Sequence, residues 1–216
     1  MSKLLAAIAC VSMLGGLPPS LAAQGRMQFS FGGTGAQEIV NSRLNGSSNR
    51  LTGLVLGGEG LLVSERFVVR LRYGQGRVTA GAAGGIEPRD IVEGEALVGI
   101  RATPWLTLWG GPSARAYTSE GSDQRWLLWS GRATARAGLL PGRMQTFVEL
   151  WGALSGNVTN PAAKAGGRGA EAGLEMRLGG QSFWGRLAYR IDSGHAAAMR
   201  ETVEAISLSL VYGAPQ

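Results

Sequence analysis

The strongest constraint on this chain is an alternation of apolar and charged residues. Residues 67–73 carry aromatic or aliphatic side chains at every second position, and Arg70 and Arg72 stand between them. Residues 183–190 repeat the arrangement. Successive side chains of a β-strand point to opposite faces, whereas a helix repeats about every 3.6 residues. The pattern therefore predicts strands with one apolar face and one charged face.

The apolar face of both segments begins and ends with an aromatic residue. Phe67 and Tyr73 bracket the first segment, and Phe183 and Tyr189 bracket the second. Aromatic rings prefer the two interfaces of a membrane, and transmembrane strands alternate between lipid-facing apolar and inward-facing polar side chains. The pattern indicates strands that face lipid and turn their charges toward the interior of a barrel.

The alternation recurs along the chain and predicts ten strands, each about as long as a tilted strand that crosses a bilayer. They fall at 26–33, 51–62, 67–73, 91–101, 105–117, 126–139, 144–154, 170–178, 183–190 and 205–212. Short connections are expected at 63–66, 102–104, 141–143 and 179–182, and longer, Gly-, Ser-, Asn- and Pro-rich loops at 34–50, 75–90, 118–125, 156–169 and 193–201. Loops of alternating length predict an all-β, up-and-down antiparallel transmembrane β-barrel of about ten strands, with eight as the alternative.

The N-terminus has the three parts of a secretory signal peptide. Lys3 supplies a positive charge, residues 4–17 are mostly apolar, and residues 20–23 are mainly small. We expect a cleaved signal peptide at 1–23 and an outer-membrane β-barrel at 24–216. An uncleaved anchor is the alternative, but the apolar stretch is shorter than the roughly 20 residues that span a bilayer. Cleavage would remove Cys10, the only cysteine, so the mature chain would have no disulfides or thiol chemistry.

The charge is basic but dispersed. The formal net charge is +6. Lys3 and Lys164 are the two lysines, and all the other basic residues counted in this charge are arginines. Nucleic-acid binding requires clustered cations, commonly interleaved with aromatic residues, and here the arginines are scattered singly through apolar strands. We therefore expect no nucleic-acid partner.

The charged positions of the alternating segments are the candidate site. These residues are predicted to face the lumen as a charge network: Arg70, Arg72, Glu93, Glu95, Arg101, Arg132, Arg136, Glu149, Glu171, Glu175, Arg177, Arg186 and Arg190, with Glu59 facing them. Buried charges must be paired or hydrated, and small barrels fill their interiors with side chains, so crossed Arg–Glu pairs are expected to plug the lumen. The alternative is a narrow, arginine-lined pore for small anionic or polar solutes.

Other candidate sites are weaker. His195, the only histidine, could act as a base with Asp192 and Ser193, but neighbouring loop residues rarely reach triad geometry. One histidine and no mature cysteine argue against a zinc site. We expect no catalytic residues, no metal site and no cofactor.

Tryptophans near predicted strand ends are expected to form an interfacial girdle. They are Trp105, Trp126 and Trp184.

Together, the signal peptide, the alternating strands, the loop pattern and the final strand Ile206–Tyr212 resemble those of small bacterial outer-membrane β-barrel proteins. The resemblance covers nearly all of the mature chain. It implies export to the outer membrane of a Gram-negative cell, contact with outer-membrane lipid, and assembly by machinery that reads a final aromatic residue. Tyr212 has the right place in the alternation, but residues 213–216 follow it, which departs from that pattern.

The leading hypothesis is a non-enzymatic outer-membrane barrel that acts structurally or through external loops whose ligand is unknown. A narrow pore, a membrane hydrolase using His195, and a soluble secreted β-barrel for a lipid-like ligand are the alternatives. The direction of the leucines separates the membrane barrel from the soluble barrel, since a soluble barrel turns them inward. The outward set is predicted to include Leu71, Leu150, Leu174, Leu187 and Leu208.

Overall fold

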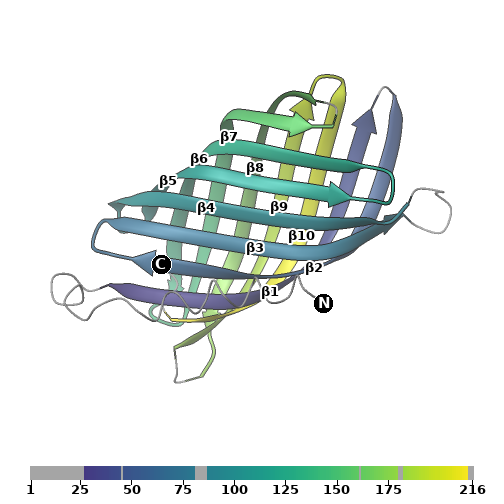
Figure 1. Ribbon diagram of the computed structural model, residues 1–216. Coiled ribbons are helices and arrows are strands. Elements are labelled where there is room, and N and C mark those ends of the chain that lie inside the picture. The colour runs from purple at the N-terminus through teal and green to yellow at the C-terminus, as the bar shows by residue number, and fades with distance from the viewer. Residues whose placement is uncertain (1–26, 45, 81–86, 161, 180–181, 214–216) are drawn as a thin grey trace, which may run out of the picture.

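The computed structural model describes residues 27–44, 46–80, 87–160, 162–179 and 182–213. The predicted signal peptide lies outside these residues. Ten strands follow one another: β1 (Gln28–Leu44), β2 (Ser47–Val63), β3 (Phe67–Ala80), β4 (Arg89–Thr103), β5 (Leu106–Thr118), β6 (Asp123–Leu140), β7 (Met144–Thr159), β8 (Ala162–Arg177), β9 (Phe183–Ala196) and β10 (Met199–Tyr212). Each pairs antiparallel with its chain neighbours, and β1 pairs with β10, which closes the barrel (Figure 1). The predicted ten-stranded up-and-down barrel is confirmed.

Both chain ends lie at one end of the barrel, because Phe31 near the start of β1 pairs with Tyr212 at the end of β10. We call this the terminal end and the opposite one the far end. Connections at the terminal end are 64–66, 104–105, 141–143 and 178–182, and those at the far end are 45–46, 81–88, 119–122, 160–161 and 197–198. No helix of the described residues is long and apolar enough to cross a bilayer.

Every strand except β5 is longer than predicted, and the lengths run from 13 residues in β5 to 18 in β6. Most residues expected in long far-end loops continue the strands instead. The reason is that these segments keep the alternation despite their Gly, Ser and Asn content: Val40, Val78 and Met199 all point inward and are buried. Packing of these side chains inside the barrel outweighs the weak strand propensity of their neighbours.

The outside of the barrel is apolar around its middle. The outward leucines named above are 45% to 67% exposed, and the charged positions beside them point inward. On β9 the apolar face runs from Phe183 to Ile191, which is about 27 Å along a strand and about 20 Å across the bilayer at the usual tilt. The predicted leucine directions are confirmed.

Aromatic residues border this apolar band. At the terminal end Phe31 and Tyr212 have ring centroids 5.5 Å apart, and Phe183 lies 5.2 Å from Tyr212. Trp105 is exposed there, as expected. Trp126 is not part of a girdle: its position in β6 turns it inward and leaves it only 5% exposed. Trp184 is half-buried, on the inward side of β9.

A bulge in β7 changes which positions face inward. Trp129 of β6 pairs with Ser155, but the next residue, Ser130, pairs with Ala153, so Leu154 is an extra residue. Inward positions are odd-numbered before the bulge, as at Glu149, and even-numbered after it, as at Val158. A single added residue reverses the alternation of a strand.

Candidate functional site in the barrel lumen

The terminal half of the lumen holds a network of ion pairs that we call the inner layer. It comprises Arg70, Arg72, Arg132, Arg136, Arg186, Glu59, Glu95, Glu149, Glu171 and Glu175. Positive and negative groups are equal in number. The strands β2, β3, β4, β6, β7, β8 and β9 supply these charges at inward positions, so residues far apart in sequence meet across the lumen.

Arg70 is the centre of the inner layer. Its Nη1 and Nη2 donate to Glu149 Oε2 and Oε1 at 2.7 and 2.8 Å, and its Nε donates to Glu95 at 3.0 Å. Arg132 joins the same two carboxylates and lies 2.6 Å from Glu95 and 3.2 Å from Glu149. Thr134 Oγ1 donates to Glu149 at 2.6 Å. The two-pronged geometry of Arg70 is the strongest form of this interaction, and both partners are almost fully buried.

The rest of the inner layer repeats this crosslinking. Arg72 contacts Glu59 and Glu171, each at 3.1 Å. Arg186 contacts Glu171 at 2.5 Å and Glu59 at 3.3 Å. The Arg186 guanidinium also lies over the Phe147 ring, 4.3 Å from its centroid. These contacts join strands on opposite sides of the barrel.

Nearer the far end lies a second network, the outer layer, formed by Arg115, Arg190, Glu38, Glu93, Asp192 and Glu201. Its carboxylates outnumber its guanidinium groups by four to two. Glu38 Oε2 is buried and has no hydrogen-bond partner among the described residues. The outer layer is therefore less completely paired than the inner layer.

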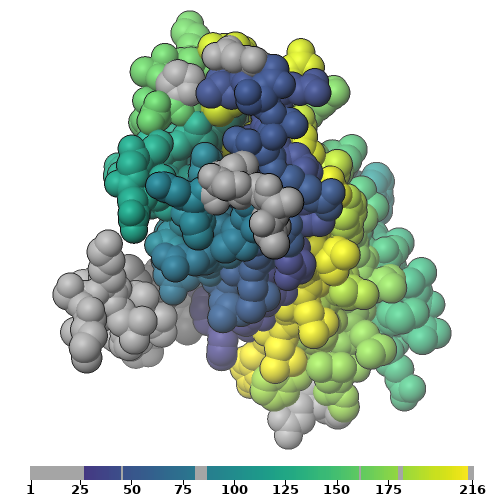
Figure 2. All heavy atoms as spheres, turned by 90° about the vertical axis from the view of Figure 1, so that its right-hand side faces the viewer, coloured from purple at the N-terminus to yellow at the C-terminus, as the bar shows by residue number. Residues whose placement is uncertain are grey.

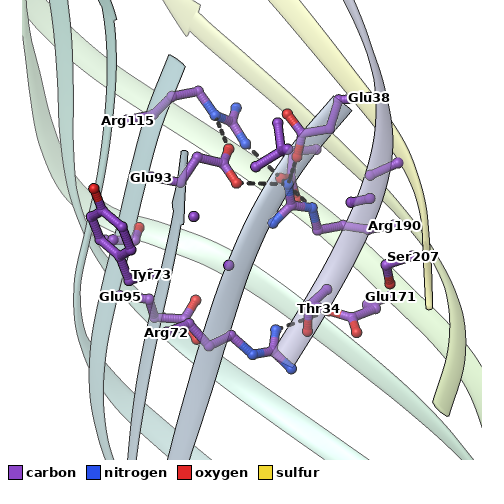
Figure 3. Close-up of a pocket in the computed structure, with 18 of the residues that line it drawn as sticks. Thr34, Glu38, Arg72, Tyr73, Glu93, Glu95, Arg115, Glu171, Arg190 and Ser207 are labelled. Carbon is purple, nitrogen blue, oxygen red and sulfur yellow. Dashed lines mark hydrogen bonds and ion pairs between the residues drawn. The ribbon is translucent and has the colours of Figure 1, made fainter. Parts of the chain in front are cut away.

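The two arginines of the outer layer divide its carboxylates between them. Arg115 contacts Glu93, and reaches Asp192 at 3.1 Å and Glu201 at 3.5 Å. Arg190 lies 2.8 Å from Glu38, 3.0 Å from Glu93 and 3.4 Å from Asp192. Figure 3 shows Arg115, Glu93, Glu38 and Arg190 gathered on one side of the cavity and Arg72, Glu95 and Glu171 on the other.

A cavity of about 170 Å³ separates the two layers. Both layers line it, together with Trp126, Trp151 and the hydroxyl-bearing Thr34, Ser207 and Ser209. The volume is enough for several water molecules or one small solute. Among the described residues no cluster of His, Cys, Asp or Glu fits a metal ion.

Apolar side chains close the lumen beyond the outer layer. The cluster at the far end contains Val40, Leu51, Val55, Val78, Ile91, Tyr117, Trp126, Leu128, Val158, Ala165, Ala196, Met199 and Val203. A smaller cluster of Val63, Val68, Leu97 and Trp109 lies at the terminal end. The far-end apolar cap, as we call the first cluster, is packed like a protein core, so the lumen is not a uniform water-filled channel.

The structure places most predicted lumen residues in the two layers, but not all. Arg101 and Arg177 lie near the terminal-end turns of β4 and β8, where Arg177 is exposed. Four members of the outer layer were not predicted: Glu38, Arg115, Asp192 and Glu201. Glu38 and Glu201 lie in segments that were expected to be loops. The available signal was their spacing: Glu38 lies two residues from the inward-facing Val40, and Glu201 lies two residues from the inward-facing Met199.

The possible triad at the end of β9 is not assembled. Asp192 points into the lumen, where it accepts a hydrogen bond from Trp151 Nε1 at 2.8 Å. Ser193 and His195 alternate to the outside and are exposed. The His195 ring lies against Gly166, since a Cβ built there would be 2.7 Å from the His195 Cε1 atom. A residue on the opposite face of the strand cannot orient the histidine.

No protein-family model and no curated protein matches the sequence. The fold is similar to those of several solved structures. The translocator domain of the autotransporter NalP from Neisseria meningitidis has 11% identity over 96% of both chains, with a TM-score of 0.47. An outer-membrane channel from Pseudomonas putida F1 has 10% identity over 87% of this chain and 96% of that one, with a TM-score of 0.49. The attachment invasion locus protein Ail of Yersinia pestis has 11% identity over 86% and 99%, with a TM-score of 0.37. Identities this low carry no information about activity.

Proposed function

We propose that this chain is an outer-membrane β-barrel with a closed lumen, which acts as a structural or interacting component of the envelope rather than as an open pore. The observation that carries the proposal is the inside-out arrangement of the strands. Apolar side chains cover the outside around the middle of the barrel, and ion-paired arginines and carboxylates occupy the lumen at that level. Only a lipid surrounding makes this arrangement favourable.

The orientation follows from the chain ends. In bacterial outer-membrane barrels both ends and the short turns face the periplasm. The terminal end would then be periplasmic and the far end external. The sequence led us to expect long external loops. Because the strands extend through most of these segments, an interaction with other molecules would use the protruding strand ends instead.

The closed lumen is supported by the energetics of the inner layer. A dehydrated arginine or glutamate is stable only when it is paired, and Arg70 and Glu149 satisfy each other with two hydrogen bonds. A permeant ion would have to break these contacts and cross the far-end apolar cap. A narrow pore for small anionic or polar solutes is the competing function, and the cavity of about 170 Å³ would give such a solute room within the lumen.

Two measurements test the proposal. After membrane fractionation the protein should be found with the outer membrane and should migrate differently on gels before and after heating. In planar bilayers the same folded preparation should give no steps of conductance, while an open general porin recorded alongside should. Recovery in the soluble periplasm would overturn the membrane barrel. Regular conductance steps from folded protein would favour the pore.

A further inference from the structure

The outward face of the far end carries a group of cations on neighbouring strands. A first row of outward-facing residues crosses β9, β10 and β1. It consists of His195, Arg200 and Arg43; His195 pairs with Arg200, and Arg200 pairs with Arg43. All three are exposed. Neighbouring strands lie about 4.8 Å apart, so the backbone positions of the three residues span roughly 10 Å.

A second row lies one outward position closer to the apolar band. It runs across β8, β9, β10, β1 and β2, with an arginine at each end and hydroxyl or amide side chains between them: Arg168, Ser193, Thr202, Asn41 and Arg50. Both arginines are exposed. We call the two rows together the basic patch. Figure 2 looks at the side of the barrel where β2, β1, β10 and β9 adjoin.

The cations of the patch lack the acidic partners that other outward arginines have. Elsewhere on the far end Arg77 lies 2.7 Å from Asp90, and Arg125 lies 3.8 Å from Asp123. In the described part of the chain no ion pair joins Arg43, Arg200 or the two arginines of the second row to a carboxylate. Like charges placed directly opposite each other on a sheet are destabilising, and Arg43 and Arg200 are direct partners. An anion held between them would relieve that repulsion.

One carboxylate lies nearby. Glu204 is the next outward residue of β10 toward the band, and it accepts a hydrogen bond from Tyr189 at 3.1 Å. Below it the outward residues of β9 and β10 become apolar, with Ile191, Ile206 and Leu208 exposed. The patch therefore sits directly above a surface that fits acyl chains.

We propose that the basic patch binds the phosphate-bearing headgroup of an anionic lipid in the outer leaflet. Guanidinium groups form paired hydrogen bonds with phosphate oxygens, and the hydroxyl and amide groups between them are further donors. The second row spans four strand spacings, about 19 Å, which is room for more than one phosphate. Cations above an apolar wall match an amphiphile whose charge and chains are joined. This inference rests on the proposed membrane location and on the far end being external.

The experiment compares two double variants that remove the same charge. Arg43→Gln/Arg200→Gln changes the patch, and Arg77→Gln/Arg125→Gln changes arginines that already have acidic partners. Each folded barrel is taken up in vesicles of phosphatidylcholine containing either a bis-phosphorylated glucosamine disaccharide lipid or no anionic lipid. Native mass spectrometry after extraction then measures the phosphorylated lipid that each barrel retains. Heat-modifiable migration is scored first, so that a barrel that never enters vesicles counts against the proposed function, not against the patch.

The patch variant should hold the phosphorylated lipid about thirtyfold more weakly than the unchanged protein, from the usual contribution of two basic side chains at an anionic lipid surface. The control variant should change by less than about threefold. Equal retention by all three folded proteins would overturn the inference, and so would equal weakening in both variants. A competition arm with inorganic phosphate separates a lipid site from a site for free phosphate: displacement by millimolar inorganic phosphate would overturn the lipid assignment.

Discussion

The pair Arg70–Glu149 offers the most direct test of a dehydrated, paired lumen. Arg70→Met removes the guanidinium and keeps an unbranched, apolar side chain in place of the arginine stem. Glu149 would retain its contacts with Arg132 at 3.2 Å and Thr134 at 2.6 Å, and Glu95 would retain Arg132 at 2.6 Å. The variant therefore loses three charged hydrogen bonds, at 2.7, 2.8 and 3.0 Å, without leaving either carboxylate alone.

The magnitude follows from these contacts. Charged hydrogen bonds contribute about 1.5–3 kcal/mol each, so three would give about 4–9 kcal/mol if nothing replaced them. Arg132 and Thr134 compensate part of that loss, which brings the expectation to the range of about 3–5 kcal/mol seen when one partner of a buried pair is removed. The double variant Arg70→Met/Glu149→Met leaves no unpaired charge at this place, because Arg132 keeps Glu95. It should therefore be destabilised by less than the sum of the two single variants, with a coupling of about 2 kcal/mol or more.

The assay is urea unfolding of the barrel in vesicles, followed by tryptophan fluorescence and by the fraction of heat-modifiable protein on gels. Arg77→Met serves as control, since Arg77 is exposed, and it should change the free energy of unfolding by less than about 1 kcal/mol. A loss below about 1 kcal/mol for Arg70→Met, with additive single and double variants, would refute the reasoning. It would mean that water screens the pair and that the lumen is open to solvent.

Three further predictions use the same assay. Gly173→Ala should destabilise the barrel by about 1–3 kcal/mol, because a Cβ there would come within 2.4 Å of the Leu187 carbonyl oxygen, whereas Gly94→Ala, with nothing within 4 Å, should be tolerated; equal effects would contradict this account of the strand contacts. Leu208→Arg should cost about 2–4 kcal/mol in vesicles if the residue faces the middle of the bilayer, and an effect near zero would place it outside lipid. Glu38→Gln should leave stability unchanged or raise it, because it removes one of the excess carboxylates of the outer layer; a loss above about 2 kcal/mol would show that its charge is fully compensated.

The faces of the strands could be predicted from the sequence, because an alternation with a period of two residues indicates which side chains of a regular strand point to the same side. Leu71 and Leu187 pointed outward as predicted, and Arg70 and Arg186 inward. Strand length was not predictable in the same way, because the Gly, Ser and Asn content of the far-end segments resembles that of loops. In β1 the residue that extends the strand into the expected loop is the buried Val40, which is followed by polar residues in the sequence.

The partners of the lumen residues were beyond the reach of the pattern. The alternation predicts that Arg70 and Glu149 both face the lumen. It does not predict that these two residues, 79 positions apart in the sequence, lie at the same height along the barrel axis. That height depends on the register of the intervening strands, and register can shift within a strand, as it does beyond Glu149 at the β7 bulge, where Leu154 is an extra residue. Nothing in the local sequence around Leu154 distinguishes this residue from a regular outward leucine.

The unequal charge of the two layers bears on what could pass through the barrel if its far-end cap ever opened. A solute arriving from the far end would meet the outer layer before the balanced inner layer, and there four carboxylates face two guanidinium groups. The basic patch lies at about the same height on the other side of the wall, because Ser193 and Thr202 directly follow Asp192 and Glu201 in the chain. The barrel wall thus has excess positive charge on its outer surface and excess negative charge on its inner surface at this height. Anions would collect on the outside of the barrel and would be repelled at the far-end entrance of the lumen. Any leak through this barrel would select for cations, the opposite of what its arginine-rich composition indicates.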